Sequence, residues 1–107
     1  MNPSYSVVYI TASDSAEAEK IARALVEGGL VACANMAPIT SIYQWEGNVK
    51  KDEEVVLLCK TLTERVDDVV ARVRQLHSYE MPCITHWPLG GGSGVYMRWV
   101  GEQTRKT

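Results

Sequence analysis

Residues 39–61 read ITSIYQWEGNVKKDEEVVLLCKT, and this segment decides the fold. Strand-forming residues occupy both of its ends, and Glu46-Gly47-Asn48 separates them as a turn with glycine where a positive φ is needed. We therefore predict a long β-hairpin whose first arm begins near Leu30. Pro38 lies within that arm and predicts a bulge or break, because proline cannot donate to a ladder. Each arm has about 13 residues, against roughly 5–6 in a usual strand.

The segments on either side of the hairpin alternate between strand and helix patterns. Asp14 is the predicted N-cap of the first helix, with Glu17 placed as in a capping box, and Gly28-Gly29 is its predicted stop. The predicted elements are a strand over residues 5–11, a helix after Asp14, the hairpin strands over 30–45 and 49–61, a helix over 63–76, a strand over 83–89 and a short helix after Ser93. This order predicts an α+β fold: a ferredoxin-like βαββαβ sandwich with an extra C-terminal helix, in a single domain over 1–107.

The strand centred on Val55-Val56-Leu57-Leu58-Cys59 is apolar on both faces, and the first strand is similar through Val7, Val8 and Ile10. Both helices cover only one face of such a sheet, and a strand with one solvated face should alternate. We therefore expect the other face to be buried against further copies of the chain, in a closed ring that the long hairpin helps to join. The alternative is a monomer whose last helix covers that face.

The composition is that of an ordinary globular protein. The 107 residues include 11 Lys and Arg against 13 Asp and Glu, which gives a formal charge of −2 and no basic footprint for nucleic acid or an anionic membrane. No apolar run approaches the roughly 20 residues of a membrane helix, and the first residues lack the pattern of a signal peptide. Three cysteines cannot all pair within one chain, so we expect reduced thiols and a cytoplasmic location.

Four motifs in order resemble a known family. They are ACAN at residues 32–35, YQWEG at 43–47, KT at 60–61 and HSYEMP at 77–82. Together they resemble the CutA family of divalent-cation-tolerance proteins along nearly the whole chain. The resemblance implies cytosolic homotrimers of ferredoxin-like subunits, similar in architecture to the PII signalling proteins, with a role in tolerance of copper and other divalent metals.

The resemblance also implies where copper ligands would lie. The ligands suggested for the family are a cysteine late in the first strand, a histidine that ends the second helix and a glutamate directly after the loop proline. The corresponding positions here hold Ile10, Leu76 or His77, and Cys83. Either Cys83 substitutes as a softer ligand, or the copper site is absent.

Our candidate metal ligands are Cys33, His77, Glu80 and Cys83, because thiolate and imidazole favour copper or zinc over magnesium or calcium. His77 and Glu80 flank one loop, so we expect them to converge. The cargo would be Cu(I), Cu(II) or another divalent metal, and folding would need none. Each residue also has a structural alternative: the thiol of Cys33 as a small buried group, and His77 as a partner of the helix dipole.

A second group of candidates is Lys60, Trp45 and Tyr79, which would line a cleft between subunits. The Lys60 ammonium would meet a small anionic effector there, as in PII-like trimers, or a neighbour's carboxylate in a structural ion pair. No spacing in the chain places a nucleophile beside a base, so we predict no enzyme. The hypotheses are therefore a metal-binding homotrimer, a PII-like signalling trimer and a scaffold for a partner protein.

Overall fold

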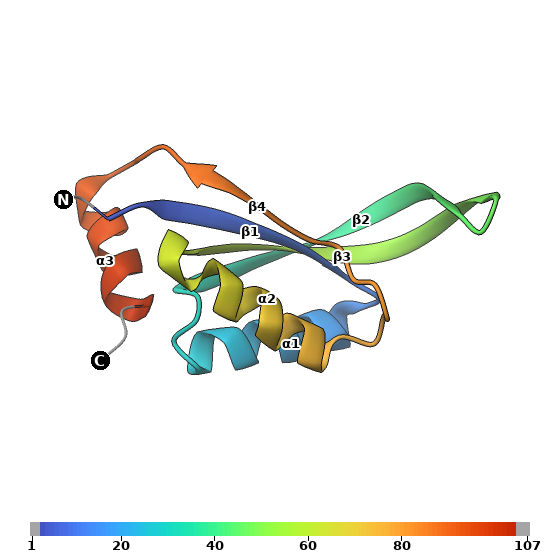
Figure 1. Ribbon diagram of the computed structural model, residues 1–107, viewed down its shortest axis with the longest axis horizontal. Helices are drawn as coiled ribbons and strands as arrows, with labels where there is room; N and C mark the ends of the chain where they lie inside the picture. Colours follow the sequence, from blue (N-terminus) through green and yellow to red (C-terminus); the bar gives the residue numbers. More distant parts are fainter. Residues whose placement is uncertain (1–2, 105–107) are drawn as a thin grey trace.

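The computed structural model describes residues 3–104, which form one four-stranded antiparallel sheet and three helices (Figure 1). The strand order β2-β3-β1-β4 is that of the ferredoxin-like sandwich predicted from the sequence. The elements are β1 (Tyr5–Ala12), α1 (Ser15–Glu27), β2 (Cys33–Trp45), β3 (Asn48–Leu62), a 3₁₀ turn η1 (Thr63–Arg65), α2 (Val66–Leu76), β4 (Ile84–Leu89) and α3 (Gly94–Thr104).

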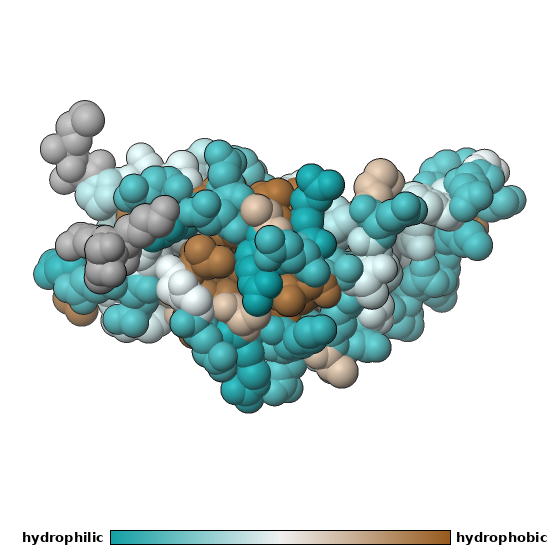
Figure 2. Space-filling model, turned by 60° about the horizontal axis from the view of Figure 1, so that its bottom comes forward, coloured by the Kyte–Doolittle hydropathy of each residue, from teal (hydrophilic) through white to brown (hydrophobic). Residues whose placement is uncertain are grey.

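Helices α1 and α2 lie side by side on one face of the sheet (Figure 1). Between them and the sheet is the core, which consists of alternate strand residues and the apolar stripes of both helices. Its fully buried members include Val8, Ile10, Ile21, Leu25, Leu57, Val69 and Val73. The outward surfaces of these helices are mostly hydrophilic, with apolar side chains between them (Figure 2). This amphipathic pattern is what positions both helices on one face.

The opposite face of the sheet, here called the open face, carries the other half of each strand. The register places Val7, Lys60 and Cys33 in one row across it, and Thr11, Val56 and Ala37 in another. Helix α3 packs at one end of this face, where Gly101 lies against Tyr5 and Leu62. The alternative prediction was that the last helix covers the open face. Helix α3 covers only that end of it.

The hairpin of β2 and β3 extends well beyond the helices (Figure 1), in a molecule whose principal extents are 47 × 24 × 21 Å. Its arms have 13 and 15 residues, and Glu46 and Gly47 form a two-residue turn with φ of 50° and 80°. The predicted bulge at Pro38 was wrong, because β2 continues through it with Pro38 opposite Val55. An edge strand tolerates proline in this way when the missing N–H would point away from the sheet.

Candidate functional site

A cleft of about 820 Å³ lies on the open face, between the hairpin and the segment that joins α2 to β4. We call it the hairpin cleft. Side chains of β1, both hairpin strands and residues 79–83 contribute to its walls. The lining residues are Tyr9, Thr11, Thr40, Ser41, Ile42, Tyr43, Gln44, Trp45, Glu54, Tyr79, Glu80, Met81 and Cys83.

The carboxylate of Glu17 holds the α2–β4 segment in place. It accepts hydrogen bonds from the backbone N–H and hydroxyl of Ser13, both at 2.9 Å, and from the N–H of Ser78 at 2.7 Å. Partial burial raises the pKa of Glu17, but these hydrogen bonds outweigh it and lower the pKa from 4.5 to about 2. The capping-box glutamate of the first helix therefore also anchors a segment 61 residues away.

The imidazole of His77 is held between two backbone segments. Its side chain is fully buried, with Nε2 2.7 Å from the carbonyl oxygen of Thr11 and Nδ1 accepting the N–H of Tyr79 at 3.1 Å. The ring also lies against that of Tyr79, with the centroids 4.7 Å apart. Both nitrogens thus have backbone partners, and Nδ1 is also 3.8 Å from Oε2 of Glu17, so the convergence of His77 with Glu80 on a metal stays a prediction.

Tyr79 connects the same segment to the hairpin. Its hydroxyl donates to Oε2 of Glu54 at 2.8 Å, and Glu54 is only 8% exposed. Desolvation and this hydrogen bond raise the pKa of Tyr79 well above its usual range. On the hairpin side of the cleft, the hydroxyl of Tyr43 donates to a carboxylate oxygen of Asp52. Two phenol–carboxylate hydrogen bonds, Tyr79 to Glu54 and Tyr43 to Asp52, therefore lie on the hairpin beside the cleft.

The four predicted metal ligands do not all gather at one site. Glu80 and the exposed thiol of Cys83 line the hairpin cleft, but Cys33 does not. Cys33 shares a row with Val7, whereas Cys83 contacts Thr11 through its backbone, about 13 Å further along β1. No group of three or more His, Cys, Asp or Glu side chains suited to a metal ion occurs within residues 3–104. Ile10 is a core residue and Leu76 packs against the core, so these positions add no ligand.

Lys60 lies with Cys33 at the α3 end of the open face, in what we call the Lys60 cluster. Its Nζ is 2.9 Å from the side-chain oxygen of Asn35, 3.9 Å from Sγ of Cys33 and 5.8 Å from the centre of the Tyr96 ring. The Tyr96 hydroxyl is 3.4 Å from the same sulfur. Within residues 3–104, Lys60 forms no ion pair with a carboxylate, and a pair with a neighbouring subunit's carboxylate stays a prediction. Trp45 and Tyr79 line the hairpin cleft and not the Lys60 cluster.

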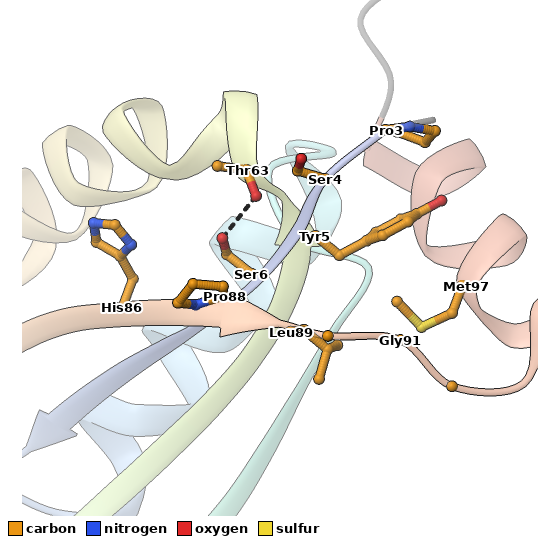
Figure 3. A pocket seen from close by; sticks show the side chains of 12 residues that line it. Pro3, Ser4, Tyr5, Ser6, Thr63, His86, Pro88, Leu89, Gly91 and Met97 are labelled. Carbon is orange, nitrogen blue, oxygen red and sulfur yellow. Dashed lines mark hydrogen bonds between the residues drawn. The ribbon is translucent and has the colours of Figure 1, made fainter. Parts of the chain in front are cut away.

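A second cleft, of about 580 Å³, lies where β4 runs into α3 (Figure 3). Ser6 and Thr63 form a hydroxyl pair at 2.8 Å on one side of it, and Met97 approaches from α3. His86 lines this cleft and Cys83 lines the other. The two residues therefore line different clefts.

Comparison with known proteins identifies the family. The family model described as "CutA1 divalent ion tolerance protein" matches residues 6–103. The chain belongs to the CutA1 family. It is 43% identical over 99 residues to the divalent-cation tolerance protein CutA of Thermus thermophilus, covering 92% of this chain and 96% of that one. It is 41% identical over 100 residues to the protein CutA homolog of Xenopus laevis, covering 92% of this chain but 66% of the frog protein.

The fold agrees with solved CutA structures. The structure of the periplasmic divalent cation tolerance protein CutA from Archaeoglobus fulgidus superimposes with a TM-score of 0.93 at 37% identity, and the match covers 94% of this chain and 99% of that chain. The four motifs that resemble CutA thus lie in a CutA fold. The motifs at residues 43–47 and 77–82 meet at the hairpin cleft, and those at 32–35 and 60–61 meet at the Lys60 cluster. No helix within residues 3–104 is long and apolar enough to span a membrane.

Sequence reasoning missed three residues that build these sites, namely Glu54, Tyr43 and Tyr96. A signal for Glu54 was present in the alternation of β3, because Glu54, Val56, Leu58 and Lys60 share a face. The acidic run at residues 52–54 concealed it, since such a run usually lies in solvent. No sequence signal places Tyr96 beside Cys33, because that contact joins residues 63 positions apart.

Proposed function

We propose that this CutA-family protein acts in divalent-cation tolerance as a homotrimer that binds a metal ion at the rim of the hairpin cleft. The observation that carries the proposal is the cleft lining, which combines the exposed thiol of Cys83 with the carboxylate of Glu80. A thiolate beside a carboxylate suits Cu(I), Cu(II) or Zn(II) better than magnesium or calcium. Binding, and not catalysis, is the activity we propose.

A second subunit completes the ligand set in this proposal. Cys83 and Glu80 are two ligands, whereas zinc and copper sites in proteins use three or four. The projecting hairpin supports an assembly, since it leaves Ile42 and Val49 exposed by 70% and 71%. A hairpin that packs on a neighbour's open face would bury these side chains and bring a second copy to the cleft.

Native mass spectrometry of the reduced protein, titrated with Cu(I), Cu(II) and Zn(II), tests this proposal. We expect a trimer that gains metal in whole-number steps, and that loses uptake in Cys83→Ser and in Glu80→Gln. Cys33→Ser is the matched control, because Cys33 lies outside the cleft, and it should retain uptake. A trimer that takes up no metal at micromolar excess refutes metal binding, and a monomer refutes the assembly.

The Lys60 cluster supports a second candidate function, a PII-like trimer that binds a small anionic effector. The ammonium of Lys60 contacts only neutral side chains within residues 3–104, and Tyr96 offers a hydroxyl beside it. Lys60→Met should then abolish binding of a carboxylate or phosphate effector and leave metal uptake intact. If neither metal nor small anions bind the trimer, both candidates are refuted and the scaffold hypothesis is the one left to test.

A further inference from the structure

The hairpin cleft has an uncompensated negative charge. Its lining includes the carboxylates of Glu54 and Glu80, and no lysine, arginine or histidine is among the residues that line it. Clefts lined by charge of one sign concentrate ligands of the opposite sign. The electrostatics of the cleft therefore favour a cation and oppose an anion.

Glu54 contributes a buried part of this charge, because more than nine-tenths of its surface is buried. Its hydrogen-bond partner is the neutral hydroxyl of Tyr79, and no ion pair joins it to a basic side chain within residues 3–104. A buried carboxylate without a counter-charge is costly, and a cation that entered the cleft would offset that cost.

Aromatic side chains form much of the wall of the cleft, and Tyr79 among them contacts Glu54 directly. Tyr9, Tyr43, Trp45 and Tyr79 all line the cleft. The faces of aromatic rings attract cations, most strongly those of organic ammonium groups, which are less tightly hydrated than metal ions. The apolar area of these rings also favours a ligand with a carbon skeleton.

The neighbouring basic residues do not neutralise the cleft. Lys50 lies opposite Tyr43 in the register, on the same face, but is not among the lining residues. Lys60 lies at the other end of the open face, in contact with Asn35. The ring of His77, behind Tyr79, is bonded to backbone groups through both nitrogens.

We propose that the hairpin cleft binds a small organic ammonium compound, with the ammonium on Glu54 and the carbon skeleton against the rings of Tyr79 and Tyr43. This inference deepens the proposed function, since it concerns the same cleft, but it uses Glu54 where metal binding uses Cys83 and Glu80.

Isothermal titration calorimetry with three probes of similar shape tests the charge requirement. The probes are 2-phenylethylammonium, the neutral 2-phenylethanol and the anionic 3-phenylpropionate. We expect the ammonium to bind at least about tenfold more tightly than the alcohol, because only it can form a charge-assisted hydrogen bond to Glu54, and the carboxylate not to bind. Equal binding of ammonium and alcohol would mean that the cleft is merely apolar, and would overturn the proposal.

Two variants and a control test the residue assignment. Glu54→Gln keeps the shape and the bond from Tyr79, and should weaken ammonium binding about tenfold or more. Tyr43→Leu removes one exposed ring and should weaken it several-fold, which provides a test that does not depend on changing a buried residue. Glu53→Gln, at a neighbouring carboxylate bonded to Thr40 and absent from the lining, should bind as the wild type does.

Several outcomes refute the inference, and each is separable from failure of the metal proposal. An unchanged affinity for the ammonium probe in Glu54→Gln refutes it. Absence of ammonium binding also refutes it, as would follow if a basic side chain of a neighbouring subunit filled the cleft. Metal uptake is measured on the same samples. Cys83→Ser should lose metal and keep ammonium binding, whereas Glu54→Gln should do the reverse.

Discussion

Replacement of Glu17 by glutamine should remove much of the stability of the α2–β4 segment. The wild-type carboxylate is the common acceptor for three groups, from Ser13 and Ser78, and its side chain is only 12% exposed. Glutamine keeps the shape but replaces one charged acceptor oxygen by an NH₂ donor. That donor would face N–H groups, so at least one hydrogen bond is lost.

The depressed pKa of Glu17 sets the magnitude and its dependence on pH. A fall from 4.5 to about 2 corresponds to at most about 3.4 kcal/mol of unfolding free energy, at 1.36 kcal/mol per pH unit. Residual contact with solvent reduces this, so we expect about 1–3 kcal/mol. Because the folded-state pKa is the lower one, the contribution is fully present above pH 4.5 and is lost as the pH falls toward 2.

Urea denaturation at fixed protomer concentration, from pH 7 to pH 2, measures this effect, since stability of an assembly depends on concentration. The difference between wild type and Glu17→Gln should be constant down to about pH 5 and then shrink. Glu19→Gln is the matched control on the same helix, where the carboxylate forms an exposed pair with Arg23 and should cost less than about 1 kcal/mol. A difference that does not change between pH 5 and pH 2 would falsify the assignment of the low pKa to these hydrogen bonds.

Three further changes test the fold and the thiols. Leu57→Ala, at a fully buried core position, should cost about 2–5 kcal/mol of unfolding free energy, and a loss under 1 kcal/mol in urea denaturation would contradict the assigned core. Iodoacetamide should label the exposed Cys83 first and Cys33 later, as followed by mass spectrometry. Cys59 should stay unlabelled, because burial raises the pKa of its thiol to about 12, and early labelling of Cys59 would contradict this. Gly47→Ala should cost about 1–2 kcal/mol by chain strain alone, since φ is +80° with open space around the site, and an equally stable variant in thermal denaturation would count against the turn geometry.

Local sequence signals located the elements well. The cap at Asp14, the stop at Gly28-Gly29 and the turn at residues 46–47 all lie where predicted, because each depends on backbone chemistry within a few residues. Pro38 shows the limit of such signals. Whether a proline interrupts a strand depends on whether its nitrogen faces a partner, and that is decided by the place of β2 at the edge of the sheet.

The candidate site was predicted less completely. The sequence proposed His77 as a metal ligand from its residue type and its place at a helix end, but the tertiary structure brings the carbonyl of Thr11 and the amide of Tyr79 to its two nitrogens. Glu54 is the converse case. Its type and its acidic neighbours indicate a solvated residue, whereas the loop after α2 places Tyr79 over it and buries it.

The sequence by itself determined the order of elements, the length of the hairpin, the excess of apolar residues on two strands and membership of a recognisable family. These properties depend on periodicity, on turn chemistry and on motif order, all of which are local. Only the tertiary structure decided which chemical groups meet. The contacts of Ser78 with Glu17, of Tyr79 with Glu54 and of Cys33 with Tyr96 join positions 61, 25 and 63 residues apart. The chemistry of a side chain in a site depends on neighbours of that kind, because burial and hydrogen bonding set both its charge and its availability.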